Sequence, residues 1–161
     1  MSTIAPDPTP ERALEVRPAG PGDIATLVEF NRALARETEG RDLDPETLHA
    51  GVQGLFARPQ YGFYLVAEYG GVVAGCLMVT FEWTDWRDGL FWWMQSVYVR
   101  PAHRGRGVYR ALYEALKARA AALPEVRGCR LYVEEHNHAA QQVYARLGMK
   151  PAGYHVYEDL F

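Results

Sequence analysis

Apolar and polar residues follow two different periods along the chain, and these periods predict its helices and strands. In four segments apolar residues recur every three or four positions, which is the spacing of one helix face. The helices are predicted at about 24–35, 45–56, 108–121 and 138–147. Alternating or continuous apolar runs predict strands at 14–17, 63–68, 72–83, 91–99, 130–134 and 154–161.

Turn and cap residues separate these segments. Asp23 and Asn137 stand where a side chain can accept a hydrogen bond from the first helical turn. Asp88-Gly89 is typical of a tight hairpin. The polar stretch from Arg36 to Asp44 predicts a loop.

The order of elements predicts an α/β fold of the mixed α+β kind. It is strand, two helices, three strands, helix, strand, helix, strand, so the first strands are expected to pair antiparallel. Residues 13–161 are expected to form one domain. Residues 1–12 hold three prolines and few large apolar groups, which predicts a disordered tail.

Composition and charge narrow the classes of function. The 161-residue chain has a formal net charge of -3 and no basic run, so nucleic-acid binding lacks electrostatic support. No apolar run reaches the roughly 20 residues of a membrane span, and no signal peptide is evident. Cys76 and Cys129 lie in apolar stretches without metal-ligand spacing. We therefore expect both to be reduced thiols in a cytoplasmic protein.

The most informative segment runs from Gln95 to Leu112, where a buried strand enters a glycine-containing loop that opens a helix. Free backbone N–H groups and the positive end of the helix dipole converge there and can bind an anion. Arg104, Arg106 and Arg110 add positive charge suited to phosphate oxygens. No Lys-Ser/Thr pair follows the glycines, which excludes a nucleotide-triphosphatase loop.

With its neighbours, this segment resembles the GNAT superfamily of acyl-CoA N-acyltransferases. The first matching motif is Val97-Tyr98-Val99 followed by Arg104-Gly-Arg-Gly-Val-Tyr109. The second is Asn137, Ala140, Tyr144 and Leu147-Gly-Met149. The resemblance covers Leu14 to the end. It implies a GNAT-like fold, with a mostly antiparallel mixed sheet of about six to seven strands flanked by about four helices. It also implies transfer of an acetyl group from acetyl-CoA to an amine.

The resemblance implies a role for each matching position. The main chain of Val97, Tyr98 and Val99 would hold the pantetheine arm, with Asn137 near the thioester and Tyr144 beside the sulfur. The pyrophosphate would lie against N–H groups of Arg104, Gly105, Arg106, Gly107, Val108 and Tyr109. Without the family resemblance, Asn137 would be interpreted as a helix cap and Tyr144 as an aromatic residue of the core.

Proton transfer adds further candidate residues. An alkyl amine with a pKa of about 10.4 is protonated at neutral pH, so a base must remove a proton before attack. Glu82, Glu134 and Glu135 are the candidate bases, and Tyr144 is the candidate general acid for the departing thiolate. A narrower resemblance is to diamine acetyltransferases, which carry a base glutamate where Gln95 stands here.

Several alternatives stay open. The acceptor is expected to be a small primary amine. Acetylation of a protein N-terminus or lysine, and a non-catalytic acyl-CoA-binding module, are the other readings. His136 and His138 lack a second ligand pair, so no metal is expected. The tryptophans around the predicted hairpin favour core packing over an acceptor pocket or a homodimer face; they are Trp83, Trp86, Trp92 and Trp93.

Overall fold

The computed structural model describes residues 13–161, so the predicted tail of residues 1–12 lies outside the described part. The chain divides into two compact units. The first ends at Leu131, and the second comprises Tyr132–Phe161.

The first unit contains a five-stranded sheet in the order β1-β2-β3-β4-β5. The first four strands pair antiparallel, and β5 runs parallel to β4. This arrangement is the mixed, mostly antiparallel sheet that the element order predicts. The strands are Leu14–Pro18 (β1), Gly62–Tyr69 (β2), Val72–Thr84 (β3), Gly89–Val99 (β4) and Val126–Leu131 (β5).

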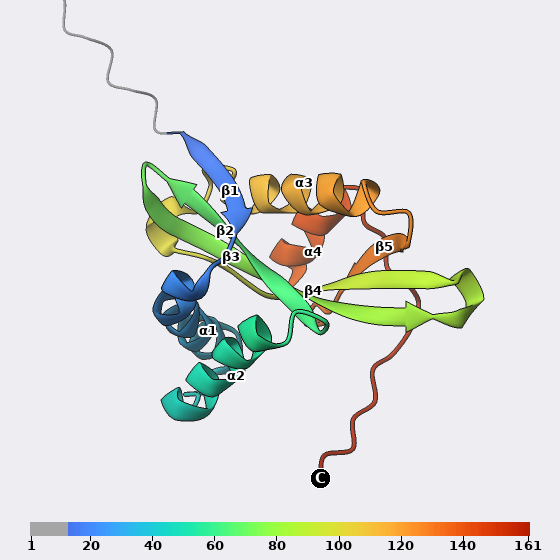
Figure 1. Ribbon diagram of the computed structural model, residues 1–161, viewed down its shortest axis with the longest axis horizontal. Coiled ribbons are helices and arrows are strands. Elements are labelled where there is room, and N and C mark those ends of the chain that lie inside the picture. Colours follow the sequence, from blue (N-terminus) through green and yellow to red (C-terminus); the bar gives the residue numbers. More distant parts are fainter. Residues whose placement is uncertain (1–12) are drawn as a thin grey trace, which may run out of the picture. The chain divides into compact units, whose positions relative to one another are not determined.

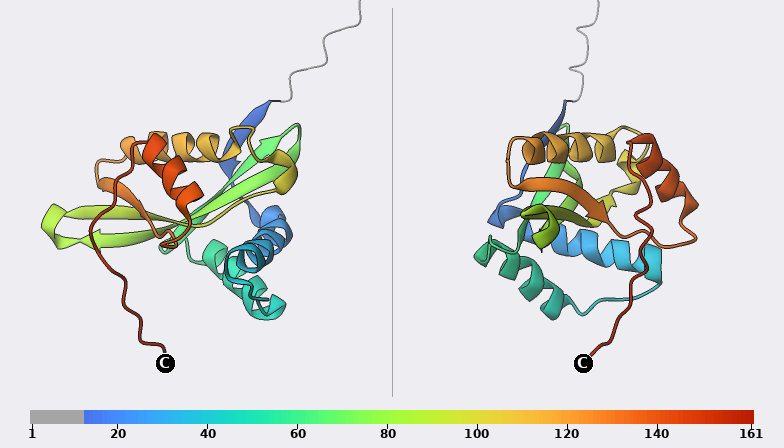
Figure 2. Two further views of the ribbon diagram at one scale, coloured as in Figure 1. Left: turned by 180° about the vertical axis from the view of Figure 1, so that it is seen from behind. Right: turned by 90° about the vertical axis from the view of Figure 1, so that its right-hand side faces the viewer.

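Helices cover both faces of this sheet. Figures 1 and 2 show α3 (Val108–Ala121) on one face, and α1 (Ile24–Glu39) and α2 (Pro45–Ala57) on the other. On the α1 face the ring of Phe30 packs against Tyr98, with centroids 5.1 Å apart. On the α3 face Leu112 and Leu116 are fully buried. The second unit contains one helix, α4 (His138–Arg146).

The fold class and the four helices are confirmed, but the strand predictions need correction. The described residues form five strands instead of six to seven. No strand forms at 154–161, because a strand needs a neighbour for its backbone groups and the second unit contains no other strand. The predicted strand 130–134 lies earlier, as β5, because parallel pairing with Leu90–Met94 fixes its register.

Helix ends also differ from the predictions. The predicted loop at Arg36–Asp44 begins later, because good helix formers extend α1 to Glu39 before Gly40 ends it at φ 62°. Asp23 precedes α1 without capping it; its carboxylate accepts instead from the Gly20 N–H at 2.8 Å. Asn137 does cap α4, accepting from the Ala140 N–H at 3.1 Å.

Candidate functional site

One edge of β4 is open along the half of the strand that leads to the glycine loop. Pairing between β4 and β5 runs from Leu90 to Met94 and ends there. Pairing between β4 and β3 continues to Val99. Over Gln95–Val99, the edge of β4 facing away from β3 therefore has no strand neighbour among residues 13–161. Apart from the Val99 carbonyl, which accepts from Arg104, main-chain groups along this edge could pair with an extended ligand.

A β-bulge lies in this open part. Cys76 pairs with Tyr98 and Met78 pairs with Gln95, so two residues of β4 oppose Leu77 alone. One of the two, Ser96, has φ 49°. The bulge changes which side chains face each side of the sheet, and it turns the main chain where β4 leaves β5.

The loop after β4 has the geometry of an anion site. Gly105 and Gly107 have φ of 73° and 78°, and a Cβ added at either would meet no atom within 4 Å. Backbone conformation, not crowding within the chain, therefore requires glycine at both positions. The helical hydrogen bond nearest the start of α3 joins the Ala111 N–H to the Gly107 carbonyl at 2.9 Å. The N–H groups before it precede the helical ladder and point out of the helix start.

The three arginines of the loop have different environments. The Arg104 guanidinium bonds to Glu37 of α1 at 2.6 Å and to the Val99 carbonyl at 3.0 Å. Arg106 lies 5.5 Å from the Tyr69 ring centroid, and Arg110 is 3.4 Å from Glu114. Arg104 thus ties α1 to the end of β4, a role that sequence reasoning missed because its partner lies far away in the chain.

The candidate base Glu82 lies on β3, opposite Phe91 of β4. Its carboxylate accepts from the Trp93 indole N–H and from Arg130 at 3.0 Å. Phe91 and Val97 are six residues apart, which is about 20 Å along a strand. Glu82 is therefore remote from Val97 and already has two hydrogen-bond donors.

The remaining predicted site residues belong to the second unit. Asn137 precedes α4, and Tyr144 lies in its last turn. The Glu134 carboxylate accepts from the His136 N–H at 2.7 Å, and the Glu135 carbonyl accepts from the Gln141 amide at 2.8 Å. The structure thus confirms the capping role of Asn137, and the ligand roles of these residues stay predictions.

Neither cysteine is a candidate nucleophile. Both are free thiols, with Cys76 fully buried and Cys129 half-buried. Burial raises the pKa of Cys76 to about 12, and burial also raises the pKa of Cys129. Because the thiolate is the reactive form, both side chains are unreactive near neutral pH.

The tryptophans divide into two groups. Trp92 is buried against Phe63 and Phe81, as core packing predicts. Trp83 and Trp86 are 61% and 83% exposed near the end of the β3–β4 hairpin, which projects beyond the helices of the first unit (Figure 1). Core packing is therefore wrong for these two, because their positions lie beyond the covering helices.

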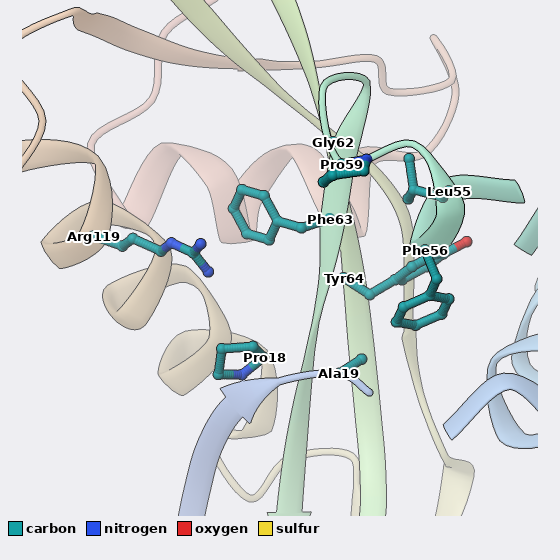
Figure 3. Close-up of a pocket in the computed structure, with 9 residues that line it drawn as sticks. All are labelled: Pro18, Ala19, Leu55, Phe56, Pro59, Gly62, Phe63, Tyr64 and Arg119. Atoms are coloured by element: carbon teal, nitrogen blue, oxygen red, sulfur yellow. The ribbon is translucent and has the colours of Figure 1, made fainter. Parts of the chain in front are cut away.

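A separate cavity of about 130 Å³ lies between α2, β2 and the end of β1 (Figure 3). It is mainly apolar, and the Arg119 guanidinium approaches it over the Phe63 ring, 4.1 Å from the centroid. None of its lining residues is a predicted site residue. They are Pro18, Ala19, Leu55, Phe56, Pro59, Gly62, Phe63, Tyr64 and Arg119.

Comparisons with known proteins support one family. Residues 26–149 match the model of the Acetyltransferase (GNAT) family. A curated relative from Salmonella typhimurium (strain LT2), L-methionine sulfoximine/L-methionine sulfone acetyltransferase, is 31% identical over 148 residues; the match covers 84% of this chain and 79% of the relative.

Solved structures agree with this family. The crystal structure of a possible acetyltransferase from Clostridium difficile 630 has a TM-score of 0.86 and 38% identity, covering 92% of this chain and 97% of that one. A predicted acetyltransferase from Clostridium acetobutylicum, solved with acetyl-CoA, has a TM-score of 0.74 and 17% identity, covering 91% and 96%. The latter shows the fold alone.

The described residues contain neither a candidate membrane span nor a cluster of metal ligands. No helix within residues 13–161 is long and apolar enough to cross a membrane. No three side chains of His, Cys, Asp or Glu gather there in a way that could hold a metal ion. The absence of a metal stays a prediction.

Proposed function

Because the chain belongs to the GNAT acetyltransferase family, we propose that it transfers the acetyl group of acetyl-CoA to the primary amine of a small molecule. Family membership makes the chain an acetyl-CoA-dependent N-acetyltransferase. The observation that carries the proposal is the open edge of β4, which leads directly into the glycine loop and the start of α3.

Acetyl-CoA would bind chiefly to main-chain groups. The pantetheine arm, which contains amides, would lie along Val97–Val99 as an added strand does. The pyrophosphate would accept hydrogen bonds from N–H groups between Gly105 and Tyr109, where the α3 dipole favours negative charge. Arg106 would add positive charge from the same loop.

The reaction would proceed by direct attack of the amine on the thioester. Freeing an amine of pKa about 10.4 at pH 7 costs roughly 4 to 5 kcal/mol, at about 1.4 kcal/mol per pKa unit. The nitrogen lone pair forms the new amide bond while the carbon–sulfur bond breaks. The amine's proton passes to a base, and the sulfur leaves as thiolate or thiol.

Tyr144 would act as the general acid for the departing sulfur, and Asn137 would contact the arm near the thioester. A phenol with a reference pKa of about 10 can protonate or hydrogen-bond a thiolate whose parent pKa is near 8.5. Both assignments rest on the family motif that the two residues match.

The base that receives the amine's proton has several candidates. Gln95 is the first residue of β4 beyond its pairing with β5, but an amide cannot take a proton from an ammonium. Glu82 lies farther along the sheet, so it could receive that proton only through a chain of waters. Glu134 and Glu135 are the other candidates, and the Glu134 carboxylate already accepts from the His136 N–H.

The acceptor is proposed to be a small molecule, in line with the Salmonella relative, which is named for two methionine derivatives. Amine panels with release of coenzyme A as the readout test this directly. The panel should include methionine sulfoximine, methionine sulfone, simple alkyl amines, diamines and a lysine peptide. Turnover of only the peptide would overturn the small-molecule acceptor, and no turnover with any amine would overturn the activity.

A further inference from the structure

One face of β3, β4 and β5 carries a row of half-buried side chains that ends at the open edge of β4. In β4, residues 91, 93 and 95 alternate with the buried Trp92 and Met94, so they share the opposite face of the sheet. Their cross-strand neighbours on β3 and β5 lie on that face as well. We call these side chains the polar row; they are Thr80, Glu82, Phe91, Trp93, Gln95 and Arg130.

Arg130 lies in this row with two of its donor nitrogens unpaired. Its Nη1 donates to the Glu82 carboxylate at 3.0 Å, and its Cζ lies 3.7 Å from the centroid of the Phe91 ring. Its Nε and Nη2 donate to no group within residues 13–161. The side chain is 30% exposed, so a ligand can reach it. Nε and Nη2 form a parallel fork that matches the two oxygens of a carboxylate.

The surroundings of Arg130 hold it in place and leave an excess of positive charge. The Glu82 carboxylate also accepts from the Trp93 indole N–H, so it is fixed from two sides. A second guanidinium, that of Arg87, lies 5.4 Å from the Phe91 centroid and has no ion pair within the described chain. Two guanidinium groups therefore flank Phe91 with one carboxylate between them, which favours an anionic ligand.

Gln95 lies at the other end of the polar row. Its Nε2 donates to Thr80 Oγ1 at 2.6 Å, and its amide oxygen, with no partner among residues 13–161, can accept from an amine N–H. Arg130 is opposite Trp93, about 7 Å along β4 from Gln95, and its guanidinium lies over Phe91, about 13 Å from Gln95. A ligand that joins Gln95 to Arg130 therefore spans about 10 Å, the length of about three extended residues.

The side chains of the row also favour a particular kind of amine. Gln95 is an amide, and Glu82 already has two hydrogen-bond donors, so the row contains no free base. At pH 7 roughly one in ten α-amines of pKa about 8 is unprotonated, against fewer than about one in a thousand alkyl amines. An α-amine, such as that of a peptide, therefore needs less help from a base.

We propose that the polar row is the acceptor site and that Arg130 selects amines carrying a carboxylate about 10 Å from the nitrogen, as in a small molecule of tripeptide length. This inference rests on the proposed function. The Nε–Nη2 fork holds the carboxylate, the Gln95 amide oxygen orients the amine, and Glu82 is a positioning residue for the fork. The nitrogen forms the amide bond as the carbon–sulfur bond breaks, its proton passes to water, and coenzyme A leaves as the thiolate.

The test compares peptides that differ only in the charge at their far end. Triglycine and triglycinamide share the amine and the length, and coenzyme A release gives kcat/KM for each. The wild type should favour triglycine about tenfold or more, the usual scale of a charge-assisted pair of hydrogen bonds. Diglycine should gain less over diglycinamide, because it is too short to span the row.

Substitution of Arg130 should remove this preference. Arg130→Gln should bring the ratio of the two kcat/KM values close to one, and Arg130→Lys should leave an intermediate ratio, because lysine keeps the charge without the fork. The ratio cancels any general loss of activity or of folded protein. Arg119→Gln is the matched control: this exposed arginine of α3 lies on the other face of the sheet, over Phe63, so the wild-type ratio should persist.

Three results would count against the proposals, each in a different way. Wild-type ratios within about twofold at every length, or a tenfold ratio that persists in Arg130→Gln, would overturn the role of Arg130. Turnover of alkyl amines, diamines or methionine derivatives without any of the glycine peptides would overturn the acceptor class and leave the acetyltransferase activity intact. A wild type that releases coenzyme A with none of these amines would instead overturn the proposed function.

Discussion

Substitution of Gly107 separates backbone strain from loss of the anion site. Gly107 has φ 78°, and an added Cβ would meet nothing within 4 Å. Gly107→Ala should therefore cost only the left-handed conformation, about 1 to 2 kcal/mol. For a chain of this size, 1 kcal/mol corresponds to about 2 to 4 °C in melting temperature, so the variant should melt roughly 2 to 8 °C lower.

Acetyl-CoA should still stabilise the alanine variant, because alanine retains the main-chain N–H. At a ligand concentration 100 times Kd the stabilisation is about 2.7 kcal/mol, or roughly 5 to 11 °C. Gly107→Glu adds the same strain and a negative charge. At roughly 6 Å from one phosphate charge, the repulsion is about 0.7 to 3 kcal/mol, depending on local screening. At the upper end the ligand's stabilisation falls below about 0.5 kcal/mol.

The assay is a thermal melt of the wild type and both variants, with and without acetyl-CoA. The alanine variant should show most of the wild-type shift, and the glutamate variant should show a smaller shift, which nearly vanishes at the upper end of the repulsion. The two variants share the backbone strain, so a difference between them reports the longer, charged glutamate side chain and not the strain. A folded glutamate variant with the full wild-type shift would refute the pyrophosphate site at this loop.

Three other predictions concern residues on different elements. Arg104→Ala should raise the KM for acetyl-CoA and leave kcat within about twofold, since the loss of its bonds to Glu37 and the Val99 carbonyl would loosen a binding surface that is used in ground and transition states alike; a lower kcat at unchanged KM would contradict it. Tyr144→Phe should lower kcat by about ten- to a thousandfold with little change in melting temperature, and wild-type turnover would exclude the general-acid role. Asp23→Asn should destabilise the protein by about 1 kcal/mol at pH 7, because the hydrogen bonds of Arg17 hold the pKa of Asp23 below its usual value. That loss should be full above the unfolded pKa of about 3.9 and shrink as pH falls through the folded value, which urea unfolding at several pH values would measure.

Elements with a strong apolar period were predictable, and elements defined by a distant partner were not. The helix at 108–121 was predicted with its observed bounds because Leu112 and Leu116 repeat on one face. β5 was placed four residues too late at its start, because its register depends on β4. The segment 154–161 has strand-like residues but no strand to pair with in its unit.

The candidate site was predictable where it depends on local sequence. Val97–Val99, the glycines and the start of α3 follow one another in the chain, so the motif shows them directly. The ion pair of Arg104 with Glu37 joins residues 67 positions apart, and no sequence pattern marks it. The only sequence signal for Ser96 is that Gln95 and Ser96 interrupt an otherwise apolar strand. Residue type alone does not reveal a positive φ.

The contacts of Arg104 lead to one conclusion about how this chain would bind acetyl-CoA. The Arg104 guanidinium bonds to Glu37 and to the Val99 carbonyl, so these contacts hold the end of β4 against α1. The side chain thus supports the backbone, and main-chain N–H groups of the open edge and of the glycine loop are left for the ligand. Recognition through the main chain explains why the loop has glycines at positive φ, and why its arginines can make structural contacts without removing the anion site.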